Sequence, residues 1–365
     1  MAGMRDLLEH GQSVWLDYIR RGMVRDGELA GLVEDGLRGL TSNPTIFGKG
    51  IGETDEYDDE LRAAITETPE TTAIQLFERV AVQDIRDAAD ILRGVYDETG
   101  GADGFVSLEV SPYLAHRTDE TIAQAKRLWK TVDRPNLMIK VPATPEGAVA
   151  LEQLIAGGVN VNATLMFSLA HYEAIAQAFV RGAAQCTRPE NIASVASFFV
   201  SRVDVVVDRK LDAMGTAEAK ALRGKAAVAN AKLAYARYQQ IFDASFDSQR
   251  RRGVRAQRVL FGSTSTKDPA YSDVKYVEEL IGPNTINTIP PETIEAFLDH
   301  GVARVTLTED LDDARATMKA LANTGIDMDE VTEFLLKDGV RKFAESFDEM
   351  VEAIETKRET ILEPA

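Results

Sequence analysis

The sequence is poor in the residues that build disulfides and metal centres. Its 365 residues include one cysteine, Cys186, and four scattered histidines. A single cysteine excludes a disulfide within the chain, so nothing in the sequence requires an oxidising compartment. The histidines show no metal-ligand spacing. We therefore expect neither a metal nor an organic cofactor.

Long apolar runs and an excess of positive charge are also missing. No apolar run reaches about 18 residues, and the first ten residues lack the apolar segment of a signal peptide. We expect no membrane association and a cytoplasmic location. The 41 Lys and Arg residues face 59 Asp and Glu residues, which gives a net charge of −18. This balance argues against a nucleic-acid partner, so an anionic substrate requires a local cluster of positive charge.

What the sequence does contain is a regular alternation of short apolar segments and helical patterns. Each strand-like segment leads into helical sequence, and no Gly-rich linker divides the chain. Such alternation implies parallel strands, and eight of them indicate a closed (β/α)8 TIM barrel, with residues 1–365 as a single domain. The strand-like segments are residues 13–19, the start of 36–45, 104–112, 136–144, 159–168, 193–200, 258–263 and 284–290.

Two further helical regions are expected. One is a helix-rich insertion over residues 205–247, between the sixth and seventh strands, and the other is an amphipathic C-terminal helix from Asp327. The sequence leaves open the role of both regions and the oligomeric state. Residues 305–308 are expected to form a further short extended piece. A doubly wound open sheet is the alternative fold, but no G-x-G-x-x-G or Walker loop follows any strand.

One strand carries a lysine among apolar residues. In residues 136–144, alternation places Lys140 on the face opposite Leu137, Ile139 and Val141, and in a barrel that face points into the lumen. Burial there favours a neutral amine, which is able to attack a carbonyl carbon. The alternative is an edge strand with the lysine in solvent.

Polar side chains occur at or near the carboxyl ends of the first six strands, where barrel active sites form. An amine with nearby carboxylates is suited to Schiff-base chemistry. The amine adds to a ketone, one carboxylic group shuttles protons, and a second takes the hydroxyl proton whose loss breaks the adjacent carbon–carbon bond. The residues are, in chain order, Asp17, Asn43, Glu109, Lys140, Asn162 with Thr164, and Ser197.

A second cluster follows the sixth and seventh strands. It consists of Arg202 and of Ser265-Thr266-Lys267. Loops after the late strands of such barrels often hold phosphate, and a guanidinium, a hydroxyl and an ammonium supply the bonds that phosphate requires. A solvated turn is the alternative. Together with Lys140, the cluster favours a phosphosugar substrate.

These segments resemble the transaldolases of the class I aldolase superfamily, over essentially the whole chain. The resemblance rests on LTSNPTI at 40–46, VSLEVS at 106–111, MIKVPAT at 138–144, NATLMFS at 162–168 and SFFVSR at 197–202. It implies a barrel that transfers a dihydroxyacetone unit through a lysine Schiff base, in the pentose phosphate pathway. The donor would be sedoheptulose 7-phosphate or fructose 6-phosphate, and the acceptor glyceraldehyde 3-phosphate or erythrose 4-phosphate.

The resemblance also implies a role for each of the polar residues. Lys140 would form the Schiff base, Glu109 and Thr164 would hold a water for proton transfer, and Asp17 would act on the sugar C4 hydroxyl. The dihydroxyacetone hydroxyls would bind Asn43, Asn162 and Ser197, and the phosphate would bind Arg202, Ser265 and Lys267.

The chain departs from the family pattern at one of these positions. Where many members have Ser-x-Arg, this chain has Ser265-Thr266-Lys267, and Ser263 is the alternative phosphate serine. Two other functions stay open: a fructose-6-phosphate aldolase, which releases dihydroxyacetone, and an inactive sugar-phosphate-binding barrel. Phe199 favours transfer over release because it cannot donate a proton where a tyrosine could.

Overall fold

The protein is described by a computed structural model covering residues 3–362. Eight parallel strands form a closed barrel in which each strand pairs with the next, and β8 (Thr285–Ile289) pairs with β1 (Gln12–Asp17). This confirms the predicted (β/α)8 barrel, and the open-sheet alternative is wrong. The other strands are β2 (Gly39–Thr41), β3 (Phe105–Glu109), β4 (Leu137–Pro142), β5 (Val161–Met166), β6 (Ser194–Phe199) and β7 (Arg258–Gly262).

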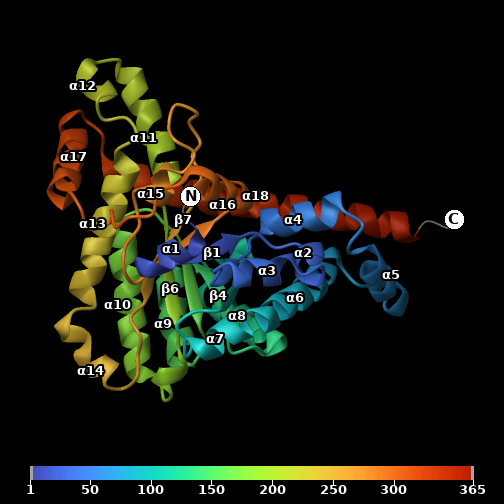
Figure 1. Ribbon diagram of the computed structural model, residues 1–365. Coiled ribbons are helices and arrows are strands. Elements are labelled where there is room, and N and C mark those ends of the chain that lie inside the picture. The colour runs from blue at the N-terminus through green and yellow to red at the C-terminus, as the bar shows by residue number, and fades with distance from the viewer. Residues whose placement is uncertain (1–2, 363–365) are drawn as a thin grey trace.

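Helices surround the barrel and extend across one end of it (Figure 1). They are α1 (Met4–Glu9), α2 (Arg21–Arg25), α3 (Glu28–Glu34), α4 (Pro44–Glu53), α5 (Asp58–Glu67), α6 (Ala73–Ile91), α7 (Arg93–Glu98), α8 (Thr118–Val132), α9 (Pro145–Ala156), α10 (Leu169–Gln185), α11 (Ser201–Met214), α12 (Ala217–Lys220), α13 (Ala226–Ile241), α14 (Asp247–Arg250), α15 (Lys275–Glu278), α16 (Pro291–His300), α17 (Leu311–Asn323) and α18 (Met328–Leu362).

One boundary and one predicted extended segment differ from the structure. The helix-rich segment between β6 and β7 begins with α11 at Ser201, before the predicted residue 205, because the helix follows β6 almost directly. Residues 305–308 form no strand in the described structure and belong to the connection between α16 and α17.

Within residues 3–362, no helix is both long and apolar enough to span a bilayer.

Strand β4 has the two faces that its alternation predicts. Leu137 and Ile139 belong to the large apolar core shared with the surrounding helices. Met138 belongs to a separate apolar cluster inside the barrel, together with Trp15 and Phe105. Lys140 shares the face of Met138 and is only 4% exposed, so the predicted lumen position of the lysine is confirmed.

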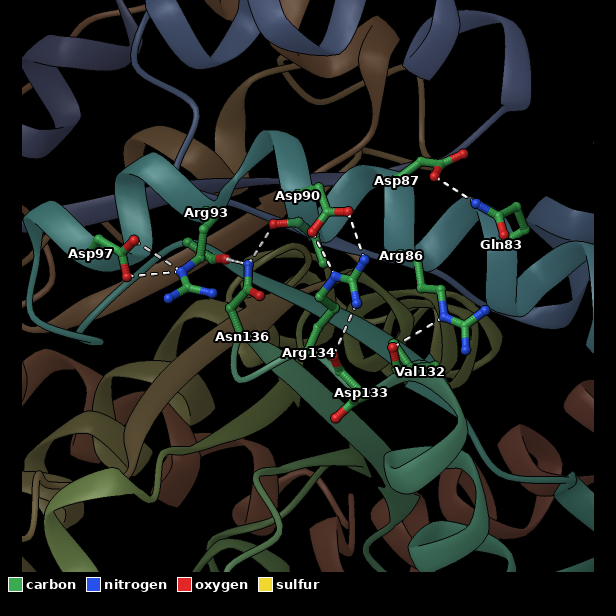
Figure 2. A network of polar contacts seen from close by, with 12 residues as sticks. Gln83, Arg86, Asp87, Asp90, Arg93, Asp97, Val132, Asp133, Arg134 and Asn136 are labelled. Atoms are coloured by element: carbon green, nitrogen blue, oxygen red, sulfur yellow. Dashed lines mark hydrogen bonds and ion pairs between the residues drawn. The ribbon is translucent and has the colours of Figure 1, made fainter.

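Polar contacts fix the other end of β4, below the lysine (Figure 2). The amide nitrogen of the fully buried Asn136 donates to the carbonyls of Ala89 in α6 and of Gly104, at 2.8 Å each. Arg134 Nη2 donates to Asp90 Oδ2 at 2.8 Å. Because Gly104 directly precedes β3, these bonds hold the starts of β3 and β4 side by side.

Helix α18 crosses the carboxyl-terminal end of the barrel and lies beside α4 (Figure 1). Glycines permit this approach: a Cβ atom on Gly48 would lie 3.3 Å from Met350 Cβ. A Cβ atom on Gly339 would lie 3.0 Å from Leu165 Cδ2 at the end of β5. The helix therefore packs on the edge of the barrel where the strands end.

Candidate active site

A cavity of about 300 Å³ opens at the carboxyl ends of the strands. Most of the predicted site residues line it: Asp17, Asn43, Lys140, Thr164, Ser197, Arg202, Ser265 and Lys267. Glu109 and Asn162 do not line this cavity. They lie beside Lys140 and Ser197 respectively, as described below. The structure therefore brings the two predicted clusters to one cavity.

Lys140 and Glu109 are neighbours on adjacent strands. They pair in the register of β3 and β4, and Lys140 Nζ lies 3.6 Å from Glu109 Oε2. The amine also donates to the carbonyl of Ser42 at 3.0 Å. Burial raises the pKa of Glu109 to about 7, although the charge of Lys140 opposes this. A carboxyl group with this pKa can both take and give a proton at neutral pH.

Two buried oxygens beside the amine are unpartnered. Glu109 Oε2 and Thr164 Oγ1 have no hydrogen-bond partner among residues 3–362. Thr164 precedes Leu165, whose φ of 64° is rare for a residue with a side chain, and the pairing of β5 with β6 is irregular here. The local distortion is confined to the part of β5 that contributes Thr164.

Asp17 is the second buried carboxylate. Thr41 Oγ1 donates to Asp17 Oδ1 at 2.8 Å and lies 2.7 Å from Thr288 Oγ1. Burial raises the pKa of Asp17, while the charges of Lys140 and Arg202 lower it. The carboxylate thus has one neutral donor and lies near two of the three cationic side chains of the cavity, Lys140 and Arg202.

The amide and hydroxyl groups of the site form a chain across β5 and β6. Ser197 Oγ donates to Asn162 Oδ1 at 2.6 Å, and Asn162 Nδ2 donates to Ser107 Oγ at 3.1 Å. Asn43 lies at the other side of the cavity, where its Oδ1 accepts from the backbone of Ile46 at 3.0 Å and caps α4. That bond leaves the amide nitrogen of Asn43 for a ligand.

Arg202 stands in the first turn of α11. Its guanidinium carbon lies 5.2 Å from the centre of the Phe199 ring. Its Nη1 is buried and has no hydrogen-bond partner among the described residues. An unpartnered buried guanidinium nitrogen beside a cavity is a strong donor for an anion.

The loop after β7 lines the same cavity as Arg202. Lys267 Nζ donates to Ser265 Oγ, and both residues line the cavity. Ser263 also lines it, with a φ of 54° and its Oγ 3.0 Å from Ser201 Oγ. Both candidate serines therefore stand at the cavity wall.

The sequence predicted only part of the cavity wall. It missed Thr41, Thr45, Ile46, Gly262, Thr288, Pro290, Glu292 and Phe343. Thr288 had a signal, because it is a polar residue near the carboxyl end of the eighth strand. Phe343 had none, since its ring reaches the cavity from α18, with its centre 6.0 Å from Lys140 Nζ.

Within residues 3–362, no three His, Cys, Asp or Glu side chains are arranged to hold a metal ion.

Comparison with known proteins gives the family. The family model described as transaldolase/fructose-6-phosphate aldolase matches residues 14–354. The chain belongs to this family. Its relatives named transaldolase include one from Frankia alni, 46% identical over 358 residues and 96% of each chain. Another, from Parafrankia sp., is 47% identical over 359 residues and 96% of each chain.

A third relative named transaldolase, from Thermobifida fusca, is 46% identical over 359 residues, covering 96% of this chain and 97% of its own. Membership of the transaldolase/fructose-6-phosphate aldolase family confirms the resemblance seen in the sequence. With relatives of this similarity and coverage, the predicted class of enzyme, a transaldolase, is confirmed as well. Sugar-phosphate substrates fit this family.

Proposed function

We propose that this cavity transfers a dihydroxyacetone unit through a Schiff base on Lys140. The unprotonated amine attacks the ketone carbon of the donor sugar, and water leaves to give an iminium. Loss of the C4 hydroxyl proton then breaks the C3–C4 bond, and its electron pair moves to the iminium to form an enamine. The enamine adds to the aldehyde of an acceptor, and water releases the new ketose. The observation that carries this proposal is the buried Lys140 amine, 3.6 Å from a Glu109 carboxyl oxygen.

The two carboxylates divide the proton transfers. We assign the proton transfers at the amine and at the leaving water to Glu109, because its carboxyl group lies 3.6 Å from Lys140 Nζ. Its pKa of about 7 allows it both to take and to give a proton. A water bound between Glu109 and Thr164 would relay these protons, which fits their two unpartnered oxygens. Asp17 takes the C4 hydroxyl proton, since it lines the cavity beside Lys140.

The remaining polar groups hold the substrate. We assign the hydroxyls of the dihydroxyacetone unit to Asn43 and Ser197, which line the cavity, and to Asn162, which pairs with Lys140 in the β4–β5 register and bonds to Ser197. The phosphate is assigned to Arg202, Ser265 and Lys267. Arg202 and Lys267 place local positive charge at the cavity, which an anionic sugar requires in a protein with a net charge of −18. Ser263 remains the alternative to Ser265 as the phosphate serine.

Phe199 supports transfer rather than release. Its ring lines the cavity and packs edge-on against Phe167, with ring centres 5.4 Å apart. A phenyl ring cannot position or donate a proton to the enamine, so the intermediate persists until an aldehyde arrives. A fructose-6-phosphate aldolase is the alternative, and an inactive sugar-phosphate-binding barrel is a weaker one because every proposed catalytic position is filled.

The test is borohydride reduction with fructose 6-phosphate, followed by intact mass measurement. We expect an adduct of dihydroxyacetone mass on the parent and on Lys126→Ala, an exposed lysine of α8, but none on Lys140→Ala. Adding erythrose 4-phosphate before the reduction should remove the adduct. A parent that forms no adduct contradicts the Schiff base. The aldolase is favoured if the rate of dihydroxyacetone release without acceptor equals the rate of ketose formation with acceptor.

We also propose that residues 1–365 form one domain and act in the cytoplasm. The single barrel supports the first statement, although residues 1–2 and 363–365 lie outside the described residues. The single cysteine and the charged substrates, which a membrane retains, support the second.

A further inference from the structure

The loop that carries Ser265 and Lys267 has no apolar anchor of its own. Thr264 and Val274 are buried, but no residue between them is. Lys267 lines the active-site cavity and also a second, more open cavity of about 410 Å³ on the far side of the loop. The loop is thus a thin wall between two cavities, and polar bonds must hold it.

Those bonds come from α11 and from the segment 221–225 that follows α12. The hydroxyl of Tyr271 donates to Asp208 Oδ2 at 2.7 Å, and Asp208 Oδ1 accepts from the backbone of Gly224 at 2.9 Å. Arg223 Nη2 donates to Asp268 Oδ2 at 2.8 Å. Asp208 is 6% exposed, so its carboxylate is a fixed point.

Gly224 shows how closely the segment fits the loop. Its φ is +67°, and a Cβ atom there would lie 2.8 Å from both Tyr271 Cζ and Lys275 Nζ. The Lys275 amine donates to the Gly224 carbonyl and lies 4.4 Å from the centre of the Tyr271 ring. Only a residue without a side chain fits at this contact.

The same helix carries both the anchor and the other half of the phosphate site. Arg202 is in the first turn of α11, and Asp208 lies further along the buried face of that helix. A bond from Asp208 to the loop therefore sets the separation between Arg202 and Lys267. Arg223 adds an electrostatic effect, because its pairing with Asp268 keeps that carboxylate from competing with phosphate for the neighbouring Lys267.

We propose that Asp208 and Arg223, acting through Tyr271 and Asp268, are positioning residues for the phosphate-binding half of the active site. This gives the helix-rich segment between β6 and β7 a role in substrate affinity. The inference rests on the proposed function, since it presumes that Arg202 and Lys267 bind the phosphate of a sugar.

The test compares substrates with and without phosphate in Tyr271→Phe and Arg223→Gln. We expect the KM for fructose 6-phosphate and the inhibition constant of inorganic phosphate to rise roughly tenfold, the effect of losing about one hydrogen bond to a charged group. The kcat, and the kcat/KM for unphosphorylated fructose, should stay within about twofold. Arg223→Lys should restore part of the phosphate affinity.

The matched control is Tyr235→Phe, which removes a hydroxyl bonded to the Pro283 carbonyl at 2.9 Å. It should leave every constant unchanged, and circular dichroism melts establish that each variant is folded. Unchanged phosphate inhibition in folded Tyr271→Phe and Arg223→Gln overturns the proposal, as does an equal loss with fructose and fructose 6-phosphate. A parent that traps no dihydroxyacetone adduct overturns the proposed function instead. The two failures are distinguishable because protection by inorganic phosphate against thermal unfolding measures the phosphate site without turnover.

Discussion

At the scale of single residues, the protonation of Glu109 connects the stability of the fold to its chemistry. The side chain is 6% exposed and its nearest cation is Lys140. Burial disfavours the carboxylate more than the lysine favours it, so the pKa is raised to about 7. In the unfolded chain a glutamic acid titrates near about 4.3.

We expect Glu109→Gln to change how stability depends on pH. The folded state keeps the Glu109 proton up to about pH 7, so the raised pKa stabilises the parent fully below the unfolded pKa. That stabilisation is lost as the pH rises through the folded pKa, by on the order of 3 kcal/mol. Denaturant unfolding between pH 4 and 8.5 should show the variant gaining on the parent with rising pH.

The same substitution should remove the limb near pH 7 from the kcat profile. The control is Glu98→Gln, at an exposed position of α7, which should follow the parent in both experiments. A constant difference in unfolding free energy between Glu109→Gln and the parent, at every pH, would contradict the raised pKa.

At the scale of elements, β4 is fixed at both of its ends. Above the lysine, Thr144 Oγ1 accepts from the backbone of Gly147 at 3.0 Å and caps α9. Below it, Asn136 bonds to α6 and to the residue before β3 (Figure 2). Glu109 and Lys140 are neighbours because of the β3–β4 register, so the bonds of Asn136 also determine how these two side chains are placed.

We expect Asn136→Ala to lower the free energy of unfolding by about 2 kcal/mol, because two buried carbonyls lose a donor. Chemical denaturation measures this. Gln83→Ala is the control, since its amide donates to Asp87 within α6 in a half-buried contact, and it should cost less than about 0.5 kcal/mol. Equal losses of unfolding free energy in the two variants would show that the buried Asn136 amide stabilises the fold no more than the Gln83 amide does.

Local patterns in the sequence were enough to predict much of these elements. Alternation of apolar residues gave the faces of β4, and the position of Thr144 before Pro145 is typical of a helix start. The positive φ of Leu165 has no signal in the sequence, because this conformation is rare for a residue with a side chain. Its side chain also lies close to Gly339 of α18, and local patterns do not predict contacts with a residue so far away in the chain.

At the scale of the whole molecule, α18 covers the cavity that the barrel builds. Phe343 is 8% exposed and its ring faces the Lys140 amine. The site residues on strands were predicted because barrel topology brings strand ends together. Phe343 was not, since an amphipathic helix shows which face is buried but not which part of the molecule it covers.

We expect Phe343→Ala to admit water to the enamine. Without acceptor, the release of free dihydroxyacetone from fructose 6-phosphate should rise several-fold relative to transfer, because closing a site against water protects reactive intermediates. A coupled assay for dihydroxyacetone measures the ratio. Phe334→Ala, on the same helix but 54% exposed, should leave it unchanged; an equal rise in both variants would attribute the effect to loosening of α18.

The closure of β1 against β8 also determines when activity appears during synthesis. Residues 12–16 of β1 cannot close the barrel until residues 285–289 of β8 have been synthesised, and α18 (328–362) is synthesised after them. A growing chain therefore has an open strand edge until residues 285–289 have been made. A nascent chain that lacks residues 285–289 has no closed lumen, so we expect it to have no complete active site. Until β8 joins β1, aggregation through that open edge competes with folding.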